Sequence, residues 1–153
     1  MAVEYIFITI LGLIIGSFIN VCIYRIPSGK SIVSPPSACT GCGSKLKALD
    51  LVPVASYIFL KGRCRYCKAA ISPRYPLIEL LTSVVFLCLF IKFGLSIPFA
   101  AYAFLMSILI AVFFIDIDHR IIPDKLVLTA IIGGIALLVY NIFNPLIEIY
   151  GND

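Results

Sequence analysis

Charged residues are scarce in this sequence. Only 13% of its 153 residues are Asp, Glu, Lys or Arg, whereas 61% are hydrophobic. The mean hydropathy is +1.09. Soluble domains contain about 45–50% apolar residues, so the composition excludes an ordinary soluble domain and indicates a membrane protein. Low-complexity tracts and internal repeats are also absent from the sequence.

The N-terminal segment lacks the features of a secretory signal peptide. No basic residue precedes its apolar run, and no small-residue cleavage site follows the run within residues 1–24. The run is also long enough to cross a bilayer. We therefore interpret this segment as a first membrane span.

Four apolar segments have, or nearly have, the length of a membrane span. They cover residues 3–23, 77–91, 97–117 and 126–149. A spanning helix needs about 20 residues, which the second segment reaches only if Tyr75, Lys92 and Phe93 join it. The sequence thus predicts an all-α polytopic membrane protein, with about four transmembrane helices in a single membrane domain of residues 1–153.

Basic residues are concentrated in one connection between these segments. Nine of the twelve Lys and Arg residues lie in residues 25–74, two lie in residues 118–125, and Lys92 is the remaining one. Basic loops stay in the cytoplasm, so we expect the first and third connections to be cytoplasmic and the N-terminus to be extracytoplasmic. The expected surroundings are a lipid bilayer, with no nucleic-acid partner.

The first connection also contains two pairs of cysteines. Cys39 and Cys42 form one C-x-x-C motif, and Cys64 and Cys67 form another after 21 residues. Two such pairs at this separation are typical of a four-thiolate zinc site. We therefore predict a cytoplasmic zinc-knuckle loop at residues 25–74, inserted between the first two spanning helices. The zinc is expected to be structural, because four thiolates leave no open coordination position.

Two alternatives to this zinc site are a pair of disulfides and a thiol oxidoreductase. A pair of disulfides would use the same cysteines, but a reducing cytoplasm disfavours them. A thiol oxidoreductase needs one pair on a thioredoxin-like fold, for which the sequence shows no pattern. Cys22 and Cys88 lie within apolar spans and are expected to pack there rather than to bind metal.

Acidic residues occur at the edges of two predicted spans. Asp116 lies near the end of the third span, in FFIDIDHRIIPD, and Glu79 lies near the start of the second. Both are expected at the cytoplasmic leaflet, and acids in membrane segments are candidates for function. Asp118 is about 200° from Asp116 around a helix, so we interpret it as a solvated helix end. For Glu79, pairing with Arg74, hydrogen bonding to backbone donors and a role near the active site all remain open.

Four ordered motifs together resemble the type IV prepilin peptidase family, whose members are prepilin leader peptidases and N-methyltransferases. They are GSFINVCIYRIP, the two cysteine pairs, ISPRYPLIELLT and FFIDIDHRIIPDKL. The resemblance implies an aspartic endopeptidase of the bacterial inner (cytoplasmic) membrane. Such an enzyme cleaves the basic leader of type IV pilus prepilins and type II secretion pseudopilins at the cytoplasmic membrane face. It also implies S-adenosylmethionine as methyl donor where the new N-terminus is methylated.

The resemblance implies two catalytic aspartates, of which one can be placed. Asp116 stands seven residues before Pro123, as the first aspartate does in the family motif. The second belongs to a Gly-x-Gly-Asp motif that this sequence lacks, because Tyr150 and Asn152 replace the glycines before Asp153. We therefore expect an N-terminal portion of such an enzyme, without its second catalytic aspartate and with Glu79 as a candidate auxiliary acid.

Two other functions remain open. The chain could be a non-catalytic zinc-binding membrane module that binds prepilins or assembles with a partner chain. It could also be a membrane metal or thiol protein built on the cysteines, although that leaves the other three motifs unexplained. The particular pilin, the residues that bind S-adenosylmethionine and the oligomeric state are not predicted.

Overall fold

The computed structural model describes residues 2–143 as a helical protein; residue 1 and residues 144–153 are not described. The helices are α1 (Ala2–Arg25), the single 3-10 turn η1 (Ala48–Asp50), α2 (Ala55–Phe59), α3 (Arg74–Phe93), α4 (Ile97–His119) and α5 (Asp124–Phe143). Two isolated bridges are the only β pairing among the described residues. The predicted all-α class is confirmed.

Four of these helices, α1, α3, α4 and α5, are long and apolar enough to cross a membrane. They coincide with the four predicted segments. The second begins at Arg74 and ends at Phe93, so it includes the three residues that its spanning length requires. The predicted end of the fourth segment, residues 144–149, and Asp153 lie outside the described residues.

The turns between helices carry recognisable stop and start residues. Gly94 has φ +62° and follows the last residue of α3, where a residue with a side chain would be strained. Ser96 then caps α4 by accepting a hydrogen bond from the backbone N–H of Phe99 at 3.3 Å. Arg120 adopts a left-handed conformation and ends α4. These short connections make α3, α4 and α5 antiparallel neighbours.

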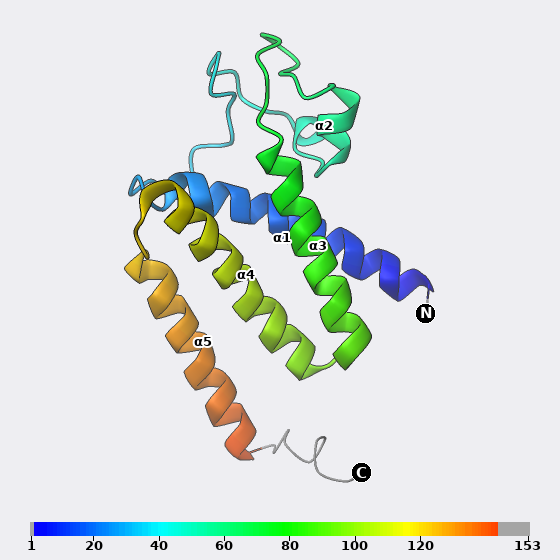
Figure 1. The fold of residues 1–153 in the computed structure, drawn as a ribbon, viewed down its shortest axis with the longest axis vertical. Coiled ribbons are helices and arrows are strands. Elements are labelled where there is room, and N and C mark those ends of the chain that lie inside the picture. The colour runs from blue at the N-terminus through cyan, green and yellow to red at the C-terminus, as the bar shows by residue number, and fades with distance from the viewer. Residues whose placement is uncertain (1, 144–153) are drawn as a thin grey trace.

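Figure 1 shows α3, α4 and α5 in sequence across the molecule, with α1 crossing α3 obliquely and reaching the end of α4. The loop of residues 26–73 rises from one end of this arrangement. The end of α1, the start of α3, the end of α4 and the start of α5 all lie at that same end. The loop and the predicted cytoplasmic helix ends are therefore close together.

Helices α1 and α3 approach each other closely through two glycines one turn apart. A Cβ atom added to Gly12 would lie 2.5 Å from Cα of Ser83, and one added to Gly16 would lie 2.6 Å from Cα of Glu79. Hydrogen bonds reinforce the contact, because Ser83 Oγ donates to the carbonyl of Thr9 at 3.0 Å. Small residues and interhelical hydrogen bonds are what holds helices together in lipid, where the hydrophobic effect between helices is weak.

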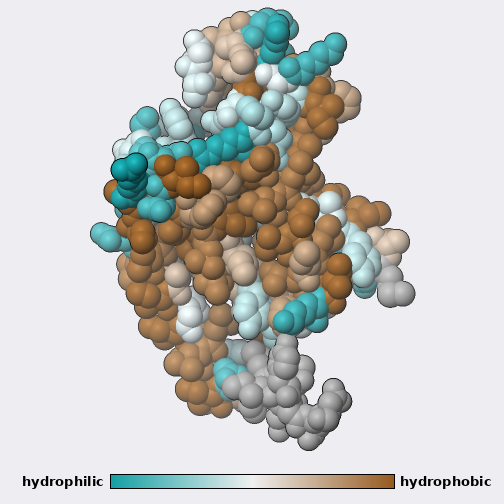
Figure 2. Space-filling model, in the orientation of Figure 1, coloured by the Kyte–Doolittle hydropathy of each residue, from teal (hydrophilic) through white to brown (hydrophobic). Residues whose placement is uncertain are grey.

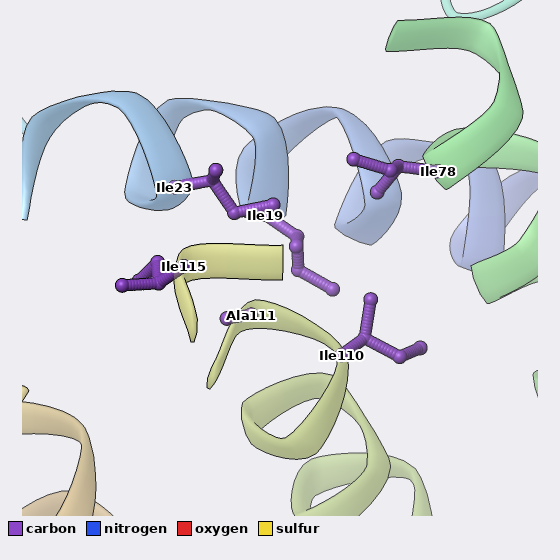
Figure 3. Packing of buried hydrophobic residues seen from close by; sticks show 6 residues of the cluster. All are labelled: Ile19, Ile23, Ile78, Ile110, Ala111 and Ile115. Carbon is purple, nitrogen blue, oxygen red and sulfur yellow. The ribbon is translucent and has the colours of Figure 1, made fainter. Parts of the chain in front are cut away.

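The main core lies where α1, α3 and α4 meet. Side chains from all three helices converge there (Figure 3), namely Ile19, Ile23, Ile78, Ile110, Ala111 and Ile115. The outer faces of the helices are also apolar, whereas hydrophilic residues gather over the loop and the helix ends beside it (Figure 2). This distribution fits helices that contact lipid and a loop that contacts water.

Candidate functional site

The two cysteine pairs lie in two turns of the same construction. In the first, the N–H of Cys39 donates to the carbonyl of Ser44 at 2.9 Å, and in the second the N–H of Cys64 donates to that of Ala69 at 2.8 Å. One isolated bridge closes each turn, Ala38 with Lys45 and Arg63 with Ala70. A backbone N–H also reaches the first sulfur of each pair, from Gly41 and from Tyr66, both at 3.4 Å. Each turn thus presents two sulfurs toward the other turn.

All four sulfur atoms lie within 4.8 Å of one another, although the pairs come from distant parts of the loop. Sγ of Cys39 and Sγ of Cys67 are 3.8 Å apart. A tetrahedral zinc site with Zn–S bonds of about 2.3 Å requires sulfur separations of about 3.8 Å, so this donor set fits a metal ion. No disulfide joins any cysteine among the described residues. The predicted convergence of Cys39, Cys42, Cys64 and Cys67 is confirmed.

The thiols of this cluster differ in acidity. Hydrogen bonds between Cys42 and Ser44, whose Oγ lies 3.3 Å from Sγ of Cys42, lower the pKa of Cys42 to about 6. Backbone N–H groups of Cys67 and Tyr66 likewise lower the pKa of Cys64. For Cys67, a hydrogen bond from the backbone of Ala69 lowers the pKa. The hydrogen bond between the Cys67 and Cys42 thiols and the desolvation of Cys67 have the larger combined effect and raise its pKa to about 11. The thiolate forms of Cys42 and Cys64 are thus favoured before any metal binds. This suits metal binding, which requires deprotonated sulfur.

Asp50 joins the second cysteine turn to the rest of the loop. Its Oδ1 accepts a hydrogen bond from Nε of Arg65 at 2.6 Å, and its Oδ2 accepts from the hydroxyl of Tyr66 at 3.2 Å and from the backbone N–H of Lys47 at 3.1 Å. Arg65 thereby holds the pKa of Asp50 below its ordinary value. These contacts fix the turn of Cys64 and Cys67 against η1.

A cavity of about 580 Å³ lies between the cysteine loop and the helices α1 and α3. Its wall includes Cys39 and Cys64 on the loop side and Asn20, Tyr75 and Glu79 on the helix side. The size is within the range of sites for small ligands, about 300–1,000 Å³. The candidate metal centre and the acidic residue of α3 thus face one common space.

Glu79 is buried at the floor of this cavity, with 7% of its surface exposed. Its Oε2 accepts a hydrogen bond from the backbone N–H of Val54 at 2.7 Å. Val54 itself has φ +58°, which is rare for a β-branched residue, and it lies at the centre of a tight turn in which Ala55 N–H donates to the carbonyl of Pro53. Of the alternatives left open for Glu79, the structure shows the backbone donor, and the strained turn is anchored on α3.

Arg74 pairs with Asp118 rather than with Glu79. Its Nη1 lies 2.7 Å and 2.6 Å from the two carboxylate oxygens of Asp118, and its Nη2 donates to the carbonyl of Phe114 at 3.0 Å. About a third of each side chain is exposed. Interpreting Asp118 as a solvated helix end was therefore incomplete, because it holds the end of α4 against the start of α3.

Asp116 lies in the last turn of α4 with its side chain exposed. It lines neither the large cavity nor the smaller one beside Asp118. No hydrogen bond or ion pair of its side chain is found within residues 2–143. The structure therefore places Asp116 and Glu79 at the same end of neighbouring helices, but it brings only Glu79 into the cavity.

Comparison with known protein families matches almost the whole described chain. Residues 10–93 match the bacterial peptidase A24 N-terminal domain, and residues 103–151 match the type IV leader peptidase family. The chain belongs to the type IV leader peptidase family. Each of the motifs that resembled this family lies within a matched region or beside one.

The chain is similar to several named relatives. The chain is 42% identical to the prepilin leader peptidase/N-methyltransferase of Myxococcus xanthus over 86% of its own length, and 34% identical to that of Dichelobacter nodosus over 90%. It is 40% identical over 76% of its length to the type 4 prepilin-like proteins leader peptide-processing enzyme of Escherichia coli. It spans 39%, 57% and 50% of these relatives. No solved structure matches it.

Asn20 and Arg25 are two polar residues of the GSFINVCIYRIP motif to which sequence reasoning assigned no role. Nδ2 of Asn20 donates to the carbonyl of Tyr75 at 3.0 Å and so joins α1 to α3 beside the cavity. Arg25, at the end of α1, donates to the carbonyls of Ser31 and Pro35 at 2.9 Å and 2.7 Å and fixes the start of the loop. The sequence signal that could have indicated these roles is the position of each residue. Asn20 is a polar residue within an apolar span, and Arg25 is a charged residue at the end of that span.

Proposed function

We propose that this chain is part of a membrane peptidase that removes the basic leader from type IV prepilins and type II secretion pseudopilins. The observation that carries the proposal is that the two family matches cover both the cysteine loop and the helix that ends in FFIDIDHRIIPD. The names of the relatives support the substrate class. The four apolar helices support cleavage beside a bilayer, where the apolar helix of a pilin would lie.

In this proposal Asp116 is one carboxyl of an aspartic protease pair. Two carboxyls around one water share a proton, because adjacent like charges cannot both ionise easily. The ionised one accepts a proton from the water, and the protonated one donates to the scissile carbonyl. The exposed position of Asp116 at the end of α4 suits access by both water and substrate. We assign no residue of this chain as the second catalytic aspartate. Glu79 remains a candidate auxiliary acid.

The four cysteines would hold a structural zinc ion in the loop, which we treat as a unit of residues 25–74 inserted in one membrane domain. With four protein ligands, such an ion would stabilise the loop and have no open position for substrate. S-adenosylmethionine would be the methyl donor if this protein, like relatives that carry N-methyltransferase in their names, also methylates the new N-terminus. The proposed location is the bacterial inner membrane, with the N-terminus outside and the loop in the cytoplasm.

A non-catalytic role is the second candidate. In it the chain would bind prepilins, or assemble with a partner chain, through the loop and cavity. The exposed Asp116, which lines neither cavity, is the observation that favours this alternative. Cleavage assays separate the two functions.

The test measures prepilin cleavage in membranes that contain the complete peptidase of which this chain is proposed to be part, because we assign only one of the two carboxyls to residues 1–153. Asp116→Asn should lower the rate by a factor on the order of 100 to 10,000, because an amide keeps the shape of the carboxyl but cannot exchange the proton. Asp118→Asn is the matched control and should retain substantial activity. Asp118 forms an ion pair with Arg74 that is about one third exposed and holds the end of α4 against the start of α3. Equal cleavage by wild type and Asp116→Asn would remove Asp116 from the mechanism. Prepilin binding without cleavage by the wild type would favour the second candidate.

A further inference from the structure

The cavity beside the cysteine loop contains a carboxylate that no cation neutralises. Glu79 is more than nine-tenths buried, and its recorded hydrogen-bond donors are neutral, the backbone N–H of Val54 and the hydroxyl of Ser17. Transferring an ionised carboxylate from water into a protein without a counter-charge is costly. A buried carboxyl that faces open space can be stabilised in its ionised form by a cation that binds beside it, and it is therefore suited to a ligand of positive charge.

Other carboxylates at this end of the molecule already have cationic partners. Asp50 is paired with Arg65, and Asp118 is paired with Arg74. Glu79 has no ion pair among the described residues, although it is buried. The difference indicates that its charge serves something other than internal pairing.

The two arginines that line the cavity are engaged elsewhere. Arg65 is held by Asp50, and Arg25 donates to the carbonyls of Ser31 and Pro35 in the loop. Neither guanidinium is recorded as a partner of Glu79. The two arginines of the cavity wall are thus held by partners in the loop. Glu79, which has no cationic partner among the described residues, lies on the helix side of the cavity.

Aromatic rings add to the attraction for a cation. Tyr24, Tyr57 and Tyr75 line the same cavity, and faces of such rings attract ammonium groups. The ammonium of Lys30, which is outside the cavity lining, lies 5.4 Å from the ring centre of Tyr24 in a contact of this kind. A cavity that contains a carboxyl and has tyrosines in its wall is a suitable environment for a substituted ammonium ion.

We propose that the cavity is a binding site for an ammonium group of the substrate, with Glu79 as its counter-ion. The inference rests on the proposed function, because a prepilin offers two such sources. One is the basic side chains of the leader, and the other is the new N-terminal amine that cleavage exposes. Glu79 is in this proposal a binding residue, and the Val54 N–H keeps its carboxylate oriented toward the ligand.

The experiment uses the protein in lipid nanodiscs and measures binding of benzylammonium by ligand-observed NMR, with benzyl alcohol and benzoate as neutral and anionic counterparts. Glu79→Gln should weaken benzylammonium binding about tenfold or more and leave benzyl alcohol unchanged, because glutamine still accepts from Val54 but has no charge. Glu4→Gln, the same change at the far end of α1, should bind all three probes as the wild type does. Equal benzylammonium binding by Glu79→Gln and wild type, or tighter wild-type binding of benzoate, would overturn the proposal.

Two peptides then identify the source of the ammonium group. One is a basic leader peptide with its N-terminus acetylated, and the other is an apolar peptide of the mature pilin N-terminus with a free amine. The peptide whose affinity falls in Glu79→Gln carries the recognised group. If wild type binds benzylammonium through Glu79 but neither peptide, the cation site stands and the prepilin function fails. If a peptide binds wild type and Glu79→Gln equally, the function stands and the cation site fails.

Discussion

At the scale of single residues, the two cysteine turns have matching backbones but unequal thiols. Gly43 and Lys68 occupy the same position, four residues after the first cysteine of each turn, and both have positive φ. The thiols differ because their neighbours differ, since Ser44 lies beside Cys42 whereas other thiols crowd Cys67. Similar backbones can therefore present cysteines of different reactivity.

Alkylation of the metal-stripped protein tests this difference. Between pH 7 and 9 Cys42 is mostly thiolate, because its pKa is lowered to about 6, while Cys67 stays protonated until the pH approaches its pKa of about 11. The thiolate is the nucleophile, so iodoacetamide at neutral pH should modify Cys42 about tenfold or more faster than Cys67. Peptide mass spectrometry over a time course measures both rates. Ser44→Ala should slow Cys42, and equal rates at the two cysteines would contradict the assignment.

At the scale of elements, the contact between α1 and α3 depends on the missing side chains of Gly12 and Gly16. Glycine lowers helix propensity, so two glycines in a spanning helix have a cost that the close approach offsets. Gly16 meets the backbone of Glu79, so this packing also sets the floor of the cavity. A change at either glycine should act on the fold and on the site together.

Gly16→Ala should destabilise the protein by about 1–3 kcal/mol, because the new Cβ would lie 2.6 Å from a backbone atom that cannot move aside. Gly134→Ala is the matched control in α5. A Cβ there meets nothing within 4 Å, so that change should be neutral or stabilise by up to about 1 kcal/mol through helix propensity. Unfolding in detergent followed by circular dichroism measures both. A neutral Gly16→Ala would show that α1 and α3 are farther apart.

The cysteine loop is the second element whose stability can be tested separately. The purified protein should contain about one zinc per chain by elemental analysis. Replacing any of Cys39, Cys42, Cys64 or Cys67 by Ser should remove it, whereas Cys88→Ser in α3 should not. Metal loss should expose the loop to protease first and leave the helix content nearly unchanged, because the long helices pack against one another without the loop. Disulfides in place of metal in the freshly isolated protein would refute the site.

At the scale of the whole molecule, polar features collect at one end. The loop, the Arg74–Asp118 ion pair, Glu79 and Asp116 are all placed there by the antiparallel order of the helices. Most basic residues are at this end too. One membrane face should therefore carry the chemistry.

Reporter fusions test which face this is. A fusion after Lys45 should be cytoplasmic, and one after Leu95, in the turn between α3 and α4, should be extracytoplasmic, because basic loops remain inside. Activity of paired reporters on each side of the membrane gives the assignment. If both positions reported the same side, α3 would not span the membrane.

The sequence by itself determined the helical class, the four spans and the cysteine ligands. Apolar runs of spanning length have few alternatives in lipid, since every backbone group must find an internal partner. Two C-x-x-C pairs likewise restrict their sulfurs to turns of one kind. These features depend on residues that are close in sequence, so local pattern was sufficient.

Only the tertiary structure decided how the acidic residues are used. Whether Arg74 pairs with Glu79 or with Asp118 depends on which faces of α3 and α4 meet, and the charges alone did not settle it. The Val54 N–H that binds Glu79 lies 25 positions away in an irregular loop. The cavity exists because Gly16 lets α1 approach α3 while the cysteine turns pack above them. Such contacts join distant segments through packing geometry, which periodicity and spacing do not specify.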